Sequence, residues 1–174
     1  MTHTQIDDFI LPVSYLEYVE EKKSILYREE VPLTHWVTIM IGLFITILTP
    51  TLLLEIFAII KEPKLVYFYL ILDLFFIATL LNFRKLVIEI NSEKLVASFG
   101  LIKKTVKLAD IVGFEHIVAK LSVFTGMGIR VGGDGSLAYL PSLGDAVKLY
   151  FKDSRPFVFS TKNHNQVLEI LGQL

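Results

Sequence analysis

Two carboxylates stand inside long apolar runs of this 174-residue chain, Glu55 in the run over residues 36–60 and Asp73 in the run over residues 65–83. An ionised carboxylate in an apolar environment is costly, so such groups face a protein interior or water. At about 1.5 Å per helical residue, Glu55 lies roughly 9 Å and Asp73 roughly 13.5 Å from the segment between the runs. In an antiparallel pair of helices the two side chains are therefore able to meet.

Two interpretations of this pair remain open. In the first, Glu55 and Asp73 form a proton or cation site, or a polar contact with another membrane subunit. In the second, they are protonated or hydrogen-bonded to neighbours such as Thr51 and serve only to fix the packing of the helices. Because no lysine or arginine lies at comparable depth in either run, a simple internal ion pair is excluded.

Pro50 lies in the middle of the first run, between Thr49 and Thr51. A proline inside a helix frees a backbone carbonyl and kinks the helix. The kink is expected either to shape a pocket or simply to set the shape of the helix.

The rest of the sequence contains no catalytic constellation. Gly-Gly-Asp-Gly at residues 132–135 is followed by neither Gly-Lys-Ser/Thr nor a helix, so it predicts a turn and not a phosphate site. No serine or threonine stands in a nucleophile motif, and the chain has no cysteine for a disulfide or thiolate site. The four histidines lack metal-ligand spacing; they are His3, His35, His116 and His164. We predict a protein that is not an enzyme and holds no metal or cofactor.

The two apolar runs predict a membrane-spanning helical hairpin over residues 36–83, with spans at 36–60 and 65–83. A hydrocarbon layer of about 30 Å takes roughly 20 helical residues, so the first run crosses with some tilt and the second just crosses. The alternative, two buried helices of a soluble protein, needs more surrounding chain to cover them.

Basic residues flank the predicted hairpin on one side of the membrane more often than on the other. Lysine and arginine near span ends are retained in the cytoplasm. The flanking set is Lys22, Lys23, Arg28, Arg84 and Lys85, against Lys61 and Lys64 between the spans. This bias predicts a cell-membrane protein with both termini and the C-terminal domain cytoplasmic. The net charge of −1 gives no reason to expect nucleic acid as a partner.

The segments on either side of the hairpin differ in character. Residues 1–35 form an N-terminal cytoplasmic segment of mixed composition, with a short helix or coil expected near 14–22 and an extended piece near 24–31. From residue 84 onward the apolar period is two, as in Leu86, Ile88 and Ile90, and turns recur every eight to twelve residues. This pattern predicts about seven antiparallel strands in a barrel or sandwich, with 121–124 among the weaker strand candidates. Residues 163–174 predict a closing amphipathic helix, with Asn163 as its cap.

Three short segments resemble the bacterial pleckstrin-homology-like families of small membrane proteins with two transmembrane helices. They are Gly-Met-Gly-Ile-Arg at 126–130, Ala-Val-Lys-Leu at 146–149 and Phe-Val-Phe-Ser-Thr-Lys-Asn at 157–163. The resemblance covers residues 84–174, and the hairpin only in layout. It implies a seven-stranded antiparallel barrel or sandwich closed by a C-terminal helix, and supplies no catalytic residues.

Such a domain raises the question of lipid headgroup binding, which needs several basic side chains around one loop. The loop at 91–94 offers one lysine beside one glutamate, so the sequence does not favour phosphoinositide recognition. A broader basic set suits general attraction to the anionic inner leaflet, although a solvated strand face explains it equally well. The set is Arg84, Lys85, Lys103, Lys104 and Lys107.

The sequence therefore predicts an α-helical membrane hairpin that carries an α+β domain over residues 84–174. Its expected role is a non-catalytic interaction or scaffolding module, whose partners are the lipid bilayer and a membrane protein or a second copy. The alternative is a small accessory subunit of a transporter or ion-translocating complex that uses Glu55 and Asp73.

Overall fold

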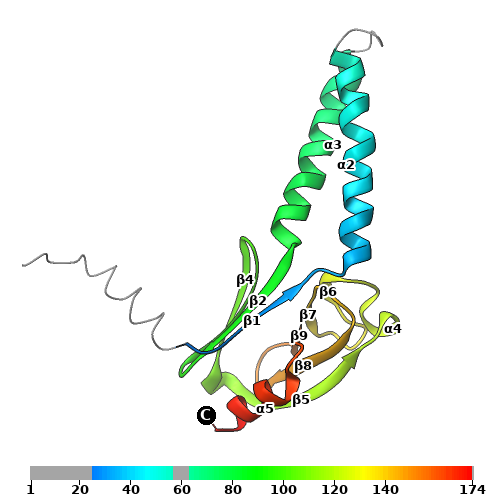
Figure 1. Cartoon of the computed structure of the whole chain (residues 1–174). Helices are drawn as coiled ribbons and strands as arrows, with labels where there is room; N and C mark the ends of the chain where they lie inside the picture. The colour runs from blue at the N-terminus through cyan, green and yellow to red at the C-terminus, as the bar shows by residue number, and fades with distance from the viewer. Residues whose placement is uncertain (1–24, 57–62, 174) are drawn as a thin grey trace, which may run out of the picture.

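The computed structural model describes residues 25–56 and 63–173 of the chain. Figure 1 shows two long helices that project together from one side of a β-rich domain. The elements in chain order are β1 (Ile25–Pro32), α2 (His35–Ile56), α3 (Pro63–Phe83), β2 (Lys85–Asn91), β3 (Lys94–Phe99), β4 (Ile102–Lys107), the 3-10 turn η1 (Leu108–Asp110), β5 (Ile111–Ala119), α4 (Leu121–Phe124), β6 (Gly128–Val131), β7 (Leu137–Leu140), β8 (Gly144–Phe151), β9 (Phe157–Ser160) and α5 (His164–Gln173).

The predicted helical hairpin is present as α2 and α3, which pack against each other along their length. Both helices are long and apolar enough to span a membrane, over His35–Leu54 and Val66–Phe83. Only 6% of each span is buried inside the protein. The rings of Phe44 and Phe76 stack between the helices, with centroids 5.2 Å apart. The predicted spans ended at residues 60 and 83; residues 57–62 lie outside the described part.

Sheet A has the order β1-β2-β3-β4, with every pair antiparallel. Leu86, Ile88 and Ile90 of β2 are fully buried, which confirms the face that their spacing predicted. β1 matches the extended piece expected near 24–31 and adds to the sheet beside β2. The segment before the hairpin and the chain after it therefore share one sheet.

Sheet B has the order β5-β8-β9-β7-β6, and all its pairs are antiparallel except β7 with β9. The sequence predicted about seven strands after residue 84, where the structure has eight, β2 to β9, and within residues 25–56 and 63–173 the two sheets do not close into a barrel. The sheets stay open because β4 and β5, which η1 separates, lie in different sheets and do not pair with each other.

The weaker strand candidate at Leu121–Phe124 was wrong, because these residues form the short helix α4. Thr125 ends this helix in the left-handed conformation, with φ of 55°. Phe124 is 2% exposed and packs with Ala138, Leu140 and Val158 of sheet B. Burial of this one ring therefore decides the local conformation, which four residues with three apolar side chains cannot specify.

The larger of two hydrophobic clusters lies between the two sheets and α5. Phe99 of sheet A, Phe157 and Val147 of sheet B, and Val167 and Leu171 of α5 all belong to it. The closing helix predicted over 163–174 is confirmed as α5, which packs on β5 and β8. The structure thus consists of an apolar hairpin and an α+β domain of two mostly antiparallel sheets with a C-terminal helix.

Candidate functional site

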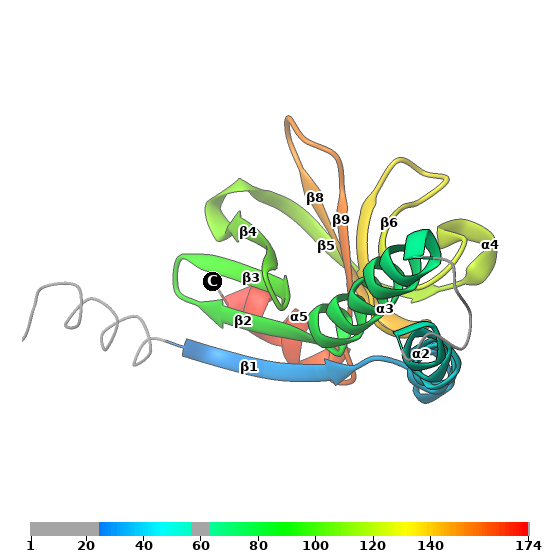
Figure 2. The ribbon, with the colours of Figure 1, turned by 90° about the horizontal axis from the view of Figure 1, so that it is seen from above.

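The foot of the hairpin is bonded to both sheets of the domain. Leu33 N–H donates to the carbonyl of Arg84 at 2.9 Å, which closes the gap between the end of β1 and the end of α3. The backbone N–H and the hydroxyl of Thr34 both donate to the carbonyl of Pro141, each at 3.1 Å. Figure 2 shows β1 running directly into α2. These bonds fix the direction in which the helices leave the domain.

Asp73 is one of the two predicted intramembrane carboxylates, and it is buried between the helices with 7% of its surface exposed. Its Oδ2 accepts a hydrogen bond from the Thr49 hydroxyl at 2.9 Å. Its Oδ1 is buried and has no hydrogen-bond partner among the described residues. Thr51, the neighbour expected from the sequence, donates instead to the carbonyl of Ile47. The side chain of Glu55 lies outside the described part, so its meeting with Asp73 stays a prediction.

Pro50 lies inside α2 on an exposed face. Its missing N–H leaves the carbonyl of Thr46 without the usual intrahelical donor. The Thr46 hydroxyl donates one turn back, to the carbonyl of Gly42 at 2.8 Å. A kink at this position remains a prediction about helix shape.

The predicted basic set separates into two groups in the structure. Lys85 is paired with Glu30 at 2.7 Å, while Arg84 beside it is exposed. Lys103, Lys104 and Lys107 lie on β4, an edge strand of sheet A.

The turn that leads into β4 is anchored at the foot of α3. Leu101 N–H donates to Oδ1 of Asn82 at 2.9 Å. The Leu101 side chain is 91% exposed, although it is large and apolar. An exposed leucine followed by lysines therefore lies where the helices meet the domain.

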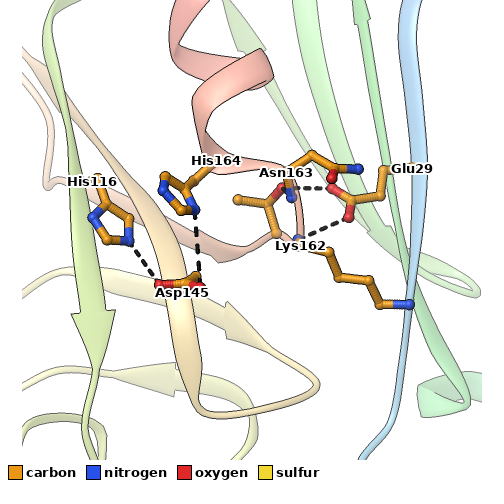
Figure 3. A network of polar contacts seen from close by, with 7 residues as sticks. Glu29, His116, Asp145, Lys162, Asn163 and His164 are labelled. Atoms are coloured by element: carbon orange, nitrogen blue, oxygen red, sulfur yellow. Dashed lines mark hydrogen bonds and ion pairs between the residues drawn. The ribbon is translucent and has the colours of Figure 1, made fainter.

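Glu29 on β1 is a buried carboxylate that sequence analysis did not single out, and 8% of it is exposed. Its Oε2 accepts hydrogen bonds from the hydroxyls of Tyr27 at 2.8 Å and Thr161 at 2.6 Å. Its Oε1 accepts one from the backbone N–H of Lys162 at 2.8 Å. Figure 3 shows this carboxylate facing the segment that leads into α5. Burial, followed by the bond and charge of Glu29, raises the pKa of Tyr27 to about 12.

A second polar cluster joins β5, β8 and the first residue of α5. His116 Nε2 lies 2.9 Å from Asp145 Oδ1, and His164 Nδ1 lies 3.9 Å from Asp145 Oδ2. The two imidazole rings stack with centroids 4.0 Å apart. His116 and Asp145 are diagonal neighbours on one face of sheet B, because His116 pairs with Val147 and Val118 pairs with Asp145. The sequence holds no spacing signal for this cluster.

The Gly-Gly-Asp-Gly segment forms the predicted turn between β6 and β7, with Gly135 at φ of 79°. Asp134 accepts hydrogen bonds from the backbone N–H and hydroxyl of Ser136, and from Lys148 Nζ at 2.6 Å. Burial raises the pKa of Asp134, but the bonds from Lys148 and Ser136 outweigh it and lower the pKa to about 2. This carboxylate stabilises the turn.

Two grooves lie on the domain near these residues. One, of about 510 Å³, runs along the end of β1 and the start of α2, and Asp145, Thr161 and Lys162 line its other side. Another, of about 700 Å³, lies between β4, η1 and the end of α5, and Lys107, Leu108 and Leu171 are among its lining residues.

No family model, curated protein or solved structure matches this chain. The functional argument therefore depends on the geometry of the chain alone.

Proposed function

We propose that this chain is a membrane-anchored interaction module with a pleckstrin-homology-like domain. In this proposal α2 and α3 cross the cell membrane, both termini and the domain are cytoplasmic, and the domain binds a membrane-protein partner or a second copy. The observation that carries the proposal is the set of hydrogen bonds from Leu33 and Thr34 that joins the hairpin to both sheets. A hairpin held in this way presents the domain in one orientation to whatever lies beside it.

The surface of the hairpin supports a lipid environment. Large apolar side chains on both helices point outward, and Ile39 and Ile71 are each 68% exposed. Apolar patches on water-soluble monomers rarely exceed a few hundred square ångströms. Two bare apolar helices of this length extend well beyond that range, whereas lipid tails solvate them at no such cost.

The sequence order of the domain supports its tethering at the membrane surface. The chain enters α2 from β1 and leaves α3 into β2, and these two strands pair up to Pro32 with Lys85 at the foot of the hairpin. The domain is therefore held close to the membrane. Tethering raises the local concentration of a domain near other membrane proteins, so that weak contacts become effective.

The edge strand β4 is the surface best suited to a partner. One side of β4 pairs with β3 and the other pairs with no strand of the described part. An extended segment of a partner is able to add to such an edge through backbone hydrogen bonds. Lys103 and Lys107 on this strand are exposed, and they favour an acidic partner segment or the anionic inner leaflet.

A second candidate function is an accessory subunit of an ion-translocating complex. The observation that favours it is Asp73, whose carboxylate is buried in the hairpin with one oxygen lacking a partner in the described chain. Intramembrane carboxylates of this kind commonly belong to ion or proton pathways. The interaction module remains the first proposal, because the Thr49 hydrogen bond already gives Asp73 a packing role.

The topology part of the proposal is tested with single cysteines, because the chain has none of its own. Lys64→Cys places a thiol at the start of α3, and Ser154→Cys places one in the exposed turn between β8 and β9. In intact cells a membrane-impermeant maleimide is expected to label the first variant only, and to label the second after lysis. Labelling of Ser154→Cys in intact cells would refute the cytoplasmic assignment.

The interaction itself is tested by photo-crosslinking in the native membrane. A photoreactive amino acid at Thr105, which is exposed on β4, is compared with the same group at Ser154, which is exposed on a turn of sheet B. We expect a discrete protein adduct from position 105 and none from position 154. An adduct of twice the 19.8 kDa chain mass identifies a second copy. The proposal fails if both positions give lipid adducts alone and the solubilised protein is a monomer.

A further inference from the structure

We propose that His116, Asp145 and His164 form a binding site for one divalent transition-metal ion of the zinc class. The three side chains come from β5, β8 and the first turn of α5, and Figure 3 shows both histidines directed at Asp145. The proposal revises the expectation, drawn from sequence spacing, that this chain has no metal site. It does not depend on the proposed membrane function.

The separations of the donor atoms fit a tetrahedral ion. One ligand atom from each of the three residues lies within 4.8 Å of the other two. Zinc binds imidazole nitrogen and carboxylate oxygen at about 2.0–2.2 Å, which places tetrahedral ligand atoms roughly 3.4 Å apart. The separations of 2.9 Å for His116 and 3.9 Å for His164 from the two Asp145 oxygens lie on either side of this value. Each of the two separations differs from it by about 0.5 Å.

His164 Nδ1 is the atom that distinguishes a metal site from a simple hydrogen bond. It is buried and has no hydrogen-bond partner within the part of the chain that the structure describes. A buried polar atom without a partner is costly, so native structures rarely leave one. The hydrogen bond between His116 and Asp145 accounts for two of the three groups and leaves this nitrogen unused, whereas a metal ion satisfies all three.

The ligand set selects the kind of ion. Imidazole nitrogens suit zinc, copper, nickel and iron, while magnesium and calcium prefer oxygen ligands. Three protein ligands leave a fourth position for water or an exchangeable ligand, as in zinc sites that are not closed. The site lies near the surface, since the side chains of His116 and Asp145 are 33% and 51% exposed. Asp145 also lines the groove beside the start of α2.

The bound ion would join the N-terminal end of α5 to sheet B. Asp145 and His116 belong to the same face of the sheet as Val147, on which α5 packs. An ion that binds the folded arrangement and not the unfolded one stabilises it by mass action. Zinc is therefore expected to slow hydrogen exchange at the first turn of α5.

The test uses the full-length chain in detergent, without a histidine tag, titrated with Zn²⁺ in a calorimeter. We expect one ion per chain and a dissociation constant raised at least about tenfold by His164→Gln or Asp145→Asn. The matched controls are Asp153→Asn, an exposed aspartate in the turn after β8, and His3→Gln and His35→Gln, which remove the other two histidines. The controls are expected to bind as the parent does. Equal affinity in all variants, or loss only in His3→Gln, would overturn the proposal.

A second measurement does not depend on whether the variants fold. Co²⁺ bound to the parent chain is expected to show the intense visible bands of tetrahedral coordination, and X-ray absorption of the zinc form should show scattering from two imidazoles. An octahedral cobalt spectrum together with the absence of imidazole scattering contradicts the site. Competition by Mg²⁺ at similar concentration contradicts it as well, since that ion prefers oxygen ligands.

Discussion

Glu29 should be the most sensitive single polar residue of the domain, and Glu29→Gln is the substitution that shows it. The carboxylate receives three donors, two hydroxyls on Oε2 and one backbone N–H on Oε1. A glutamine keeps one acceptor oxygen and turns an amide N–H₂ toward donors on the other side. At least one charge-assisted bond is lost, and such bonds contribute about 1.5–3 kcal/mol each.

The Lys162 N–H cannot turn away, so the glutamine oxygen has to face it, and the two hydroxyls must rotate to face the amide N–H₂. The expected destabilisation from the lost charge-assisted bonds is about 2–4 kcal/mol. The whole free energy of unfolding of a domain is about 5–15 kcal/mol. The matched control is Glu30→Gln, one residue further along β1. Glu30 is 44% exposed and pairs with Lys85 at the surface, where solvent and salt screen the pair, so its loss should destabilise the domain far less than the loss of Glu29.

The assay is hydrogen exchange by mass spectrometry on the full chain in detergent. A loss of 3 kcal/mol accelerates exchange through local opening by roughly 100-fold. Because Glu29 joins β1 to the segment before α5, faster exchange is expected in both β1 and the first turn of α5. Equal acceleration by Glu29→Gln and Glu30→Gln, or acceleration that leaves α5 unchanged, would refute the reasoning.

Three further predictions test other parts of the structure. Asp134→Asn should cost about 1 kcal/mol at neutral pH, a value discounted because the Asp134 side chain is 34% exposed. The folded pKa of Asp134, about 2, lies below its usual 3.8. This stabilisation is therefore present above pH 3.8 and is lost as pH falls toward the folded pKa. Urea unfolding at neutral and acidic pH should show this loss of stability in the parent but not in the variant. Gly100→Ala should destabilise the β3–β4 turn by about 1–2 kcal/mol in thermal unfolding, since Gly100 has φ of +50° and an added Cβ would lie 2.6 Å from Asn82 Oδ1. The control Gly133→Ala should be neutral in that assay, because its added Cβ has no neighbour nearer than 3.8 Å. Thr49→Val should weaken packing of the hairpin in bicelles by about 0.6 kcal/mol and at most about 1.7 kcal/mol. Asp73→Asn should leave this packing nearly unchanged, because the amide oxygen still accepts the hydrogen bond from Thr49. Loss of an ion flux in Asp73→Asn with the hairpin intact would instead favour the ion-translocating subunit.

Much of the secondary structure follows from local patterns in the sequence. The apolar runs predict α2 and α3 because each is long and apolar enough for a helix that crosses a hydrocarbon layer. The alternation of Leu86, Ile88 and Ile90 predicts β2 because residues two apart share a strand face. The four residues Leu121–Phe124, three of them apolar, are too few to show a period, and the strand expected there is the helix α4.

The polar clusters could not be predicted in the same way. Glu29 and Thr161 are 132 residues apart in sequence, and His116 and Asp145 are 29 apart. Neither separation repeats a helix or strand period, so no local pattern marks these residues as partners. Glu29 meets Thr161 because β1 joins sheet A ahead of the hairpin, and His116 meets Asp145 because β5 pairs with β8.

By itself the sequence determined the apolar hairpin, the change to a strand period after residue 84 and the closing helix, because each depends on the solvent preference of neighbouring side chains. The tertiary structure alone decided that β1, which precedes the hairpin in the sequence, pairs with β2, which follows it. It also decided that the sheets stay open and that two distant histidines stack beside Asp145. These features depend on the pairing of strands and the packing of one core, in which residues far apart in the chain are selected by shape and hydrogen bonding.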